Sequence, residues 1–245
     1  MPKLTDNLEN FKLPGSYGYS ATKLSDLGAT EYTLVTLVVD DSGSIDSFRT
    51  EMVDAIKSVV NACRYSPRAD NLMIRLVTFS NHLKEIHGFK LLANCNPDDY
   101  NGVLVMGGAT ALFDATVNSV DATSAYGKTL VDSQFSTNGI VIVITDGEDN
   151  QSSNGINSVA ASLKKATVTE TLESLVSILI GVNVTEASVA TALSDLHTKG
   201  GFTQYVELKD ASAKTLAKLA QFVSKSISSQ STSLGTGGPS KSLTF

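Results

Sequence analysis

The sequence predicts an α/β fold, a doubly wound, mostly parallel sheet with helices on both faces and one antiparallel edge strand. Apolar, β-branched runs of strand length alternate with segments in which apolar residues recur at helical spacing. The 245 residues, 42% of them apolar, suffice for one full core but not for two generous domains. We therefore expect one α/β domain with shorter ends.

The first strand and helix are the clearest elements. Residues 32–39 form a nearly continuous apolar run that ends at Asp40, which is typical of a strand buried on both faces. Apolar residues then recur at helical spacing from Phe48 to Cys63, and Ser66-Pro67 closes that segment.

The later segments repeat this alternation. Residues 72–80 predict a second strand, and residues 82–89, which mix polar and apolar side chains, predict the antiparallel edge strand beside it. Strands alternating with helices indicate right-handed crossovers in a parallel sheet. The remaining elements are expected as helices near 110–122, 158–166, 187–197 and 216–227, and as strands near 139–145, 175–182 and 202–208.

The two ends differ from this middle part. Residues 1–30 lack sustained periodicity and are interpreted as an arm that lies on a surface, residues 31–228 as the domain, and residues 229–245 as a flexible Ser/Gly-rich tail. The apolar anchors of the arm are expected to dock on this domain or a neighbour. Burial of Leu243 and Phe245 in the tail is expected to need a partner surface.

Charge and composition exclude several classes of protein. A net charge of −6 without any basic run argues against a nucleic-acid-binding protein. Residues 1–15 contain no apolar core of signal-peptide length, and no later apolar run approaches the length of a membrane span, so we expect a soluble, cytoplasmic protein. The two cysteines, Cys63 and Cys95, are interpreted as free thiols, with a single disulfide as the alternative.

Polar residues at three predicted strand ends form the candidate site. Ligands of open α/β sheets bind outside the carboxyl ends of the strands. Asp40, Ser42 and Ser44 alternate along the turn after the first strand, Thr110 follows a glycine pair, and Asp146 follows the strand near 139–145. The turn can aim three oxygens at one point.

These motifs, D-x-S-x-S, a Thr after a Gly-rich loop and an Asp in T-D-G, resemble the metal-ion-dependent adhesion site of von Willebrand factor type A domains, and the similarity runs from about residue 32 to residue 226. The resemblance implies that Ser42, Ser44 and Thr110 coordinate a metal through their hydroxyls. It also implies that Asp40 and Asp146 hold the metal directly or through waters.

The donor set suits Mg²⁺, with Mn²⁺ or Ca²⁺ as alternatives. Mg²⁺ takes six oxygens at about 2.0–2.1 Å, which hydroxyls, carboxylates and waters supply. Two carboxylates do not over-neutralise the ion, so a position left to water can accept a Glu or Asp from a partner protein.

Each residue also has an ordinary structural reading. Ser44 and Thr110 could cap helices, Asp146 could belong to a turn, and Asp40 could bond to backbone. The metal reading is preferred because five oxygen-bearing residues fall at three strand ends in the order of the family. The neighbouring acids are interpreted as solvated rim residues; they are Asp41, Glu148 and Asp149.

Other catalytic or nucleotide-binding signals are weak. Gly127-Lys128-Thr129 ends like a phosphate loop, but it follows a helix, and Ala122 stands where the first glycine belongs. Ser42 cannot act as the general acid of an aspartate-nucleophile phosphatase. We expect the three histidines to lie on the surface; they are His82, His87 and His197.

Three functions are therefore considered. The first is a metal-dependent binding module that recruits a partner protein presenting Asp or Glu. The second is a structural subunit of a homo-oligomer or larger assembly, such as a virion or secretion particle. The third and least favoured is a Mg²⁺-dependent phosphohydrolase, so we expect that the chain is not an enzyme.

Overall fold

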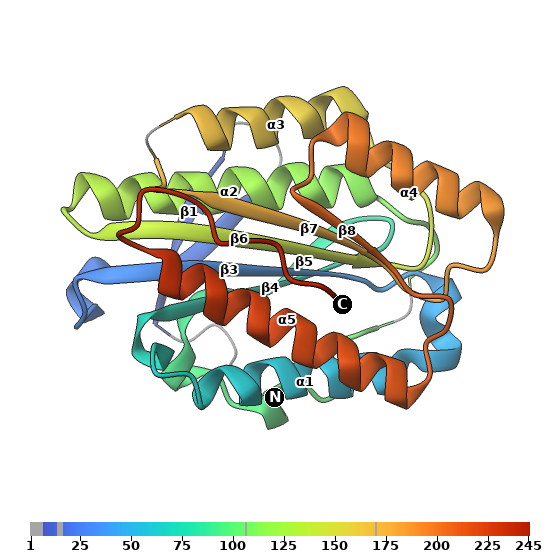
Figure 1. Cartoon of the computed structure of the whole chain (residues 1–245), viewed down its shortest axis with the longest axis horizontal. Coiled ribbons are helices and arrows are strands. Elements are labelled where there is room, and N and C mark those ends of the chain that lie inside the picture. The colour runs from blue at the N-terminus through green and yellow to red at the C-terminus, as the bar shows by residue number, and fades with distance from the viewer. Residues whose placement is uncertain (1–6, 14–16, 106, 170) are drawn as a thin grey trace.

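A computed structural model describes residues 7–13, 17–105, 107–169 and 171–245 (Figure 1). Eight strands of this part form one sheet with the order β1-β2-β5-β4-β3-β6-β7-β8. The strands are β1 (Leu8–Lys12), β2 (Gly18–Thr22), β3 (Glu31–Asp40), β4 (Leu72–Phe79), β5 (Leu83–Leu91), β6 (Ser136–Thr145), β7 (Leu175–Gly181) and β8 (Gln204–Glu207). The α-helices are α1 (Arg49–Arg64), α2 (Leu112–Asp132), α3 (Ile156–Val168), α4 (Ala187–Gly200) and α5 (Ala213–Ser233).

The middle of the sheet is parallel and confirms the predicted fold class. β3 pairs in parallel with β4 on one side and with β6 on the other, and β7 and β8 continue the parallel order. Nine of the ten residues of β3 are buried, as its apolar run predicts. Helices α1 and α5 cover one face and α2, α3 and α4 the other, as Figure 1 shows. The carboxyl ends of β3 and β6 therefore meet at one edge of the sheet.

The antiparallel strand differs from the prediction in its position. β5 is antiparallel to β4, as predicted, but it is not the outermost strand. β2 pairs with β5 on its far side, and β1, antiparallel to β2, forms the edge. Both extra strands come from the segment that was interpreted as an arm. In the described part of the arm, β1 and β2 thus pair as a β-hairpin that docks on its own domain.

The chain after α5 lies against its own domain. α5 runs to Ser233, beyond the predicted boundary at residue 228. The Glu173 carboxylate accepts hydrogen bonds from the backbone N–H groups of Gly235 and Gly237, while Leu243 packs on the core and Phe245 meets Phe222 edge to face. The expectation that Leu243 needs a partner surface is therefore wrong, because this side chain is partly buried on its own domain. Phe245 remains exposed, so the need for a partner surface to bury it stays a prediction. The flexibility of this segment stays a prediction.

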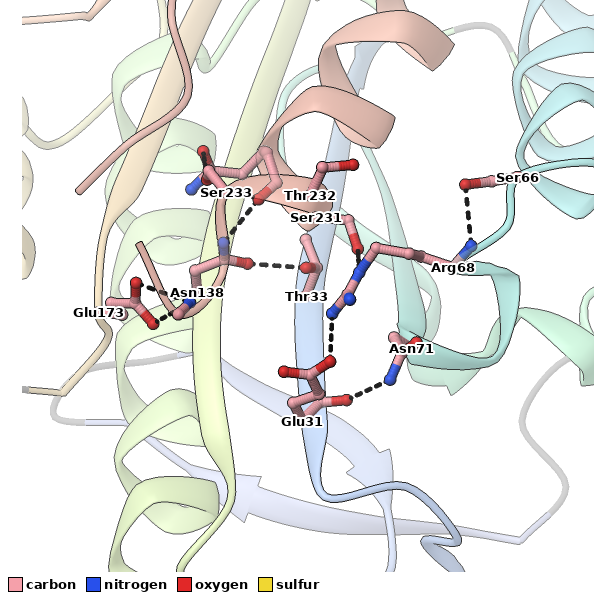
Figure 2. Close-up of polar contacts among 12 residues, drawn as sticks. Glu31, Thr33, Ser66, Arg68, Asn71, Asn138, Glu173, Ser231, Thr232 and Ser233 are labelled. Atoms are coloured by element: carbon pink, nitrogen blue, oxygen red, sulfur yellow. Dashed lines mark hydrogen bonds and ion pairs between the residues drawn. The ribbon is translucent and has the colours of Figure 1, made fainter. Parts of the chain in front are cut away.

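A polar cluster fastens the end of α5 at the amino ends of the strands (Figure 2). The Asn138 amide joins the hydroxyl of Thr33 on β3 to the backbone carbonyl of Gln230 on α5. On the other side of α5, Arg68 donates to the Ser231 hydroxyl and to the Glu31 carboxylate. These bonds satisfy buried polar groups where helix and sheet meet.

Not every side chain predicted to lie on the surface does so. His82 is exposed and His197 half-buried, but His87 is fully buried, with one ring nitrogen bonded to the Gly88 carbonyl and the other to the Tyr100 hydroxyl. Burial lowers the pKa of His87 to about 4, so the ring is neutral at pH 7.

The two cysteines and the phosphate-loop-like motif match their predictions. Cys63 and Cys95 are both free and both buried. Gly127-Lys128-Thr129 lies inside α2 rather than in a loop, and Lys128 forms an ion pair with Asp132 one helical turn on. A Cβ at Gly127 would come within 2.4 Å of the Leu172 side chain. This glycine therefore serves helix packing.

Candidate metal centre

The turn after β3 brings the first three predicted ligands to the carboxyl edge of the sheet. β3 ends at Asp40, and the chain then turns into a 3₁₀ segment, η2 (Gly43–Phe48), which leads into α1. The Ser42 backbone N–H donates to the Asp40 Oδ1 atom at 2.8 Å, so the carboxylate itself fixes the turn. The Ser42 and Ser44 hydroxyls share a hydrogen bond of 3.0 Å, which sets their oxygens side by side.

The end of β6 supplies the fourth predicted ligand. The Ser44 hydroxyl donates to the Asp146 Oδ1 atom at 2.7 Å, across more than a hundred residues of sequence. Asp40, Ser42, Ser44 and Asp146 are thus linked into one cluster of oxygens. Its floor, at Asp40 and Ser42, is buried, whereas Ser44 is exposed and Asp146 is half-buried. The cluster is therefore open to solvent on one side.

Backbone hydrogen bonds hold Thr110 at the same edge of the sheet. Its N–H donates to the Asn150 side chain at 2.8 Å, and its carbonyl accepts from the Asn150 N–H, four residues after Asp146. The preceding Gly107 donates to the Asp41 carbonyl, and a Cβ there would collide with Ser80 at 2.1 Å. The loop before α2 is thereby tied both to the end of β3 and to the segment after β6. The Thr110 side chain forms no described hydrogen bond with the other four residues.

Sequence reasoning missed three residues that build this edge. The Thr145 hydroxyl donates to the Asp40 Oδ2 atom at 2.6 Å, so both oxygens of that carboxylate accept a bond. Asn81 accepts from the N–H groups of Gly108 and Ala109, and Asn150 holds Thr110 as described. Thr145 stood within the T-D-G motif, and Asn81 and Asn150 each follow a strand end within a few residues. That placement was the available signal.

Asp41 is not the solvated rim residue that was predicted. It is 5% exposed; its Oδ2 atom accepts from the Val105 N–H at 2.7 Å, while Oδ1 has no partner among the described residues. Its carbonyl holds Gly107, so Asp41 fastens the loop that precedes Thr110. Asp149 is half-buried and accepts hydrogen bonds from the Phe113 N–H at the start of α2 and from the nearby Ser152 hydroxyl, whereas Glu148 is exposed.

The electrostatics of the cluster suit a cation. Burial raises the pKa of Asp40 to about 6, partly offset by the bonds from Ser42 and Thr145, and nearby Asp146 raises it further. Burial also raises the pKa of Asp146. Within the described residues, neither carboxylate pairs with a Lys, Arg or His. A divalent ion would supply the missing positive charge.

The donor set also limits the kind of metal. Among the described residues no group of three or more His, Cys, Asp or Glu side chains could hold an ion. The cluster has two carboxylates and otherwise hydroxyl oxygens, which are hard ligands of the kind that Mg²⁺, Mn²⁺ and Ca²⁺ prefer. The residues present therefore fit a hard divalent cation better than zinc held by Cys and His.

Taken together, the doubly wound sheet and the oxygen cluster at its carboxyl edge define an α/β domain with a candidate site for a hard cation. The sequence model of the von Willebrand factor type A domain matches residues 35–222, which is most of the chain. The chain therefore belongs to the von Willebrand factor type A domain family. No curated protein sequence matches it.

Solved structures share the fold at low sequence identity. The PilB minor pilin from Streptococcus sanguinis is 18% identical with a TM-score of 0.55, over 82% of this chain and 62% of the pilin. The pilus adhesin SpaC from Lactobacillus rhamnosus GG is 12% identical with a TM-score of 0.58, over 82% and 31% of the two chains in one of its crystal forms. The proximal thread matrix protein 1 of the mussel byssus, in a form with a zinc-occupied MIDAS motif, is 20% identical with a TM-score of 0.55, over 80% and 46%.

This chain spans less than two thirds of each of these proteins, and at such identities the likeness concerns the fold. In the described residues, no helix combines the length and apolar character that crossing a membrane requires.

Proposed function

We propose that this domain binds one divalent cation, Mg²⁺ before Mn²⁺ or Ca²⁺, and uses it to hold an acidic side chain of a partner protein. Asp40, Ser42, Ser44, Thr110 and Asp146 are the proposed ligands. The observation that carries the proposal is the hydrogen-bonded chain from Asp40 through the turn of Ser42 and Ser44 to Asp146. It gathers hard oxygen donors from two strand ends at one solvent-open point.

The bound ion would supply an electrophilic point to which a carboxylate can bind. The rest of the site prepares for this. The buried Asp40 gives the cluster its negative charge, Thr145 and Ser42 fix that carboxylate in place, and Asp41 holds the loop that carries Thr110. A partner with an exposed Asp or Glu is therefore the expected ligand. Two proteins of similar fold, a pilus adhesin and a minor pilin, are compatible with a role in protein contacts.

The other parts of the proposal follow from the same residues. Ser42 occupies the position where a phosphatase of this motif needs a general acid, so we propose a binding protein and not an enzyme. Steady release of inorganic phosphate from small esters would contradict this. A cytoplasmic location stays a prediction from the sequence.

Isothermal titration of the whole chain with Mg²⁺ tests the metal site. We expect one ion per chain, and no binding in Asp146→Ala, because removing one of two carboxylates deprives the ion of a principal charge. Asp132→Ala, which removes an exposed aspartate of α2, is the matched control and should bind as the parent does. Unchanged binding in Asp146→Ala would refute the assignment.

The partner is tested separately, with the chain as bait and the metal as the variable. Proteins captured with Mg²⁺ should be released by EDTA and should not be captured by a Ser42→Ala, Ser44→Ala double variant whose circular dichroism is unchanged. Capture that is equal with and without metal would favour the structural-subunit alternative over a metal-dependent module.

A further inference from the structure

The N-terminal hairpin, formed by β1 and β2, is added to the edge of the domain. β1 and β2 pair with each other along five residues each, from Leu8↔Thr22 to Lys12↔Gly18. By contrast, one register pair, Ala21↔Phe89, joins β2 to β5. The hairpin also lies outside the family match, which begins at residue 35. The pairing within the hairpin is therefore more extensive than the strand pairing that joins it to β5.

The surface that receives the hairpin is shaped for this particular segment. The Ser20 N–H and hydroxyl both donate to Glu85 Oε1, at 2.9 and 2.7 Å. The Tyr126 hydroxyl of α2 donates to the Thr22 carbonyl at 2.7 Å. A Cβ at Gly88 would lie 1.8 Å from the Ser20 carbonyl oxygen, so only glycine allows β2 to come this close. We call this surface, formed by Glu85, Gly88, Phe89 and Tyr126, the hairpin seat.

An empty seat would expose groups that the domain keeps from water. Tyr19 meets Phe89 edge to face at 6.2 Å between ring centroids and Tyr126 at 6.4 Å, while Phe11 stacks on Tyr19 at 5.0 Å. Glu85, which holds Ser20, also forms an ion pair of 2.6 Å with Arg75, a residue with no exposed surface. Aromatic rings and a buried ion pair are costly to uncover. The seat therefore has to be covered by a segment with the sequence of this hairpin.

The linker between the hairpin and the domain allows the seat to be filled either by the hairpin of the same chain or by that of a second copy. Residues 23–30 link β2 to β3, and six of these eight residues are exposed. Eight residues in extended form reach up to about 26–29 Å. A hairpin from a second copy would make the same contacts in the seat as the chain's own hairpin. The choice between them depends on linker entropy and on protein concentration.

We propose that the hairpin seat is a docking site for the N-terminal hairpin of a second copy of this chain, so that copies can join by exchanging strands β1 and β2. This inference goes beyond the proposed metal site and does not depend on it. At micromolar concentration the chain's own hairpin occupies the seat, because the short linker of residues 23–30 holds it there at an effective concentration on the order of millimolar. Exchange prevails where copies are crowded or where the chain's own pairing is impaired.

Two full-length variants, each defective in one half of the contact, test the exchange. Gly88→Val closes the seat but leaves the hairpin intact, and Tyr19→Asp removes the central ring of the hairpin but leaves the seat intact. Each variant alone should be a monomer by native mass spectrometry at micromolar concentration. Their mixture should give a 1:1 heterodimer, in which the intact hairpin occupies the intact seat.

The control carries both substitutions in one chain. This double variant has neither a working hairpin nor a working seat, so it should stay monomeric when mixed with either single variant. If a single variant fails to fold by circular dichroism, the milder pair Gly88→Ala and Phe11→Ser replaces it. A mixture of folded variants that remains monomeric would overturn the proposal, and so would a heterodimer that the double variant also forms.

Discussion

Asp40 is both a predicted ligand and a buried acid, and the two properties are coupled. Burial raises its pKa to about 6, above the ordinary value near 3.8. Without metal, the folded state therefore holds a proton that the unfolded state has lost. Between about pH 4 and pH 6 this group makes the metal-free domain less stable as the pH rises. A cation at the site favours the charged form and opposes that loss.

The same coupling predicts that protons compete with the metal. Lowering the pH from 7 to 5 should weaken Mg²⁺ affinity about tenfold, because a ligand with a pKa near 6 is mostly protonated at pH 5 and binding must release that proton. Isothermal titration at several pH values in buffers of different ionisation enthalpy would measure both the affinity and the proton release. If the Mg²⁺ affinity is the same at pH 5 and pH 7, Asp40 does not take part in metal binding.

The sequence predicts which residues lie at the candidate site better than it predicts which side chains are buried. That Asp40, Ser42, Ser44 and Asp146 lie together could be predicted, because each lies at or just after a strand end and the carboxyl ends of parallel strands share one edge. Their role as metal ligands stays a prediction. The burial of Asp41 and His87 could not be foreseen. Asp41 is covered by the loop that holds Val105 and Gly107, and His87 by Tyr100, segments whose positions depend on tertiary packing.

Among the helices, α5 has a defined start. The Ser212 side chain accepts a hydrogen bond from the Thr215 N–H at 3.3 Å and caps the helix. Ser212→Ala should lower the free energy of unfolding by about 1 kcal/mol, because one N–H at the helix start loses its partner. Urea unfolding would measure the change. Ser194→Ala, at an exposed position within α4, is the control and should be neutral or slightly stabilising.

The contacts of the segment after α5 predict how fast a protease cleaves it. Glu173 accepts from the N–H groups of Gly235 and Gly237, and Leu243 packs on the core. Glu173→Ala should therefore speed trypsin cleavage after Lys241, whereas the exposed Glu186→Ala should not. Intact-mass measurement during limited digestion follows the loss of the last four residues. Equally fast cleavage in the parent chain would mean that this segment is mobile, as the sequence predicted.

The core strands and helices were predictable because their signals are local. β3, β6 and β7 are apolar runs, and the five helices have apolar residues at helical spacing, so their existence follows from short windows of sequence. The hairpin was missed for the opposite reason. β1 and β2 have five residues each, and β2 is stabilised by β5 and α2, which lie more than sixty residues away in the sequence.

At the scale of the whole molecule, the metal centre and the hairpin seat use different parts of the sheet. The proposed ligands follow β3 and β6 or precede α2, whereas the seat lies on β5 and α2 beneath the hairpin. No described hydrogen bond joins the two sets of residues. Substitutions in one set should therefore act independently of the other.

The independence of the metal centre and the hairpin seat can be tested by measuring metal binding in a seat variant and heterodimer formation in a metal-site variant. Gly88→Val should bind Mg²⁺ with the affinity of the parent chain, and Asp146→Ala introduced into both members of the exchanging pair should leave heterodimer formation unchanged. Titration gives the first result and native mass spectrometry the second. Loss of metal binding in a folded Gly88→Val chain would mean that the hairpin supports the metal centre.

The residue at the position of Gly88 also predicts which other members of the family have an N-terminal hairpin seated on β5. A side chain at this position cannot coexist with a strand seated as β2 is, because its first carbon would overlap the Ser20 carbonyl. Relatives with a larger residue there should have an uncovered β5 or a differently placed N-terminus, whereas a glycine followed by an aromatic residue should mark chains with this appendage. One position in the middle of the sequence would thus identify how a family member begins.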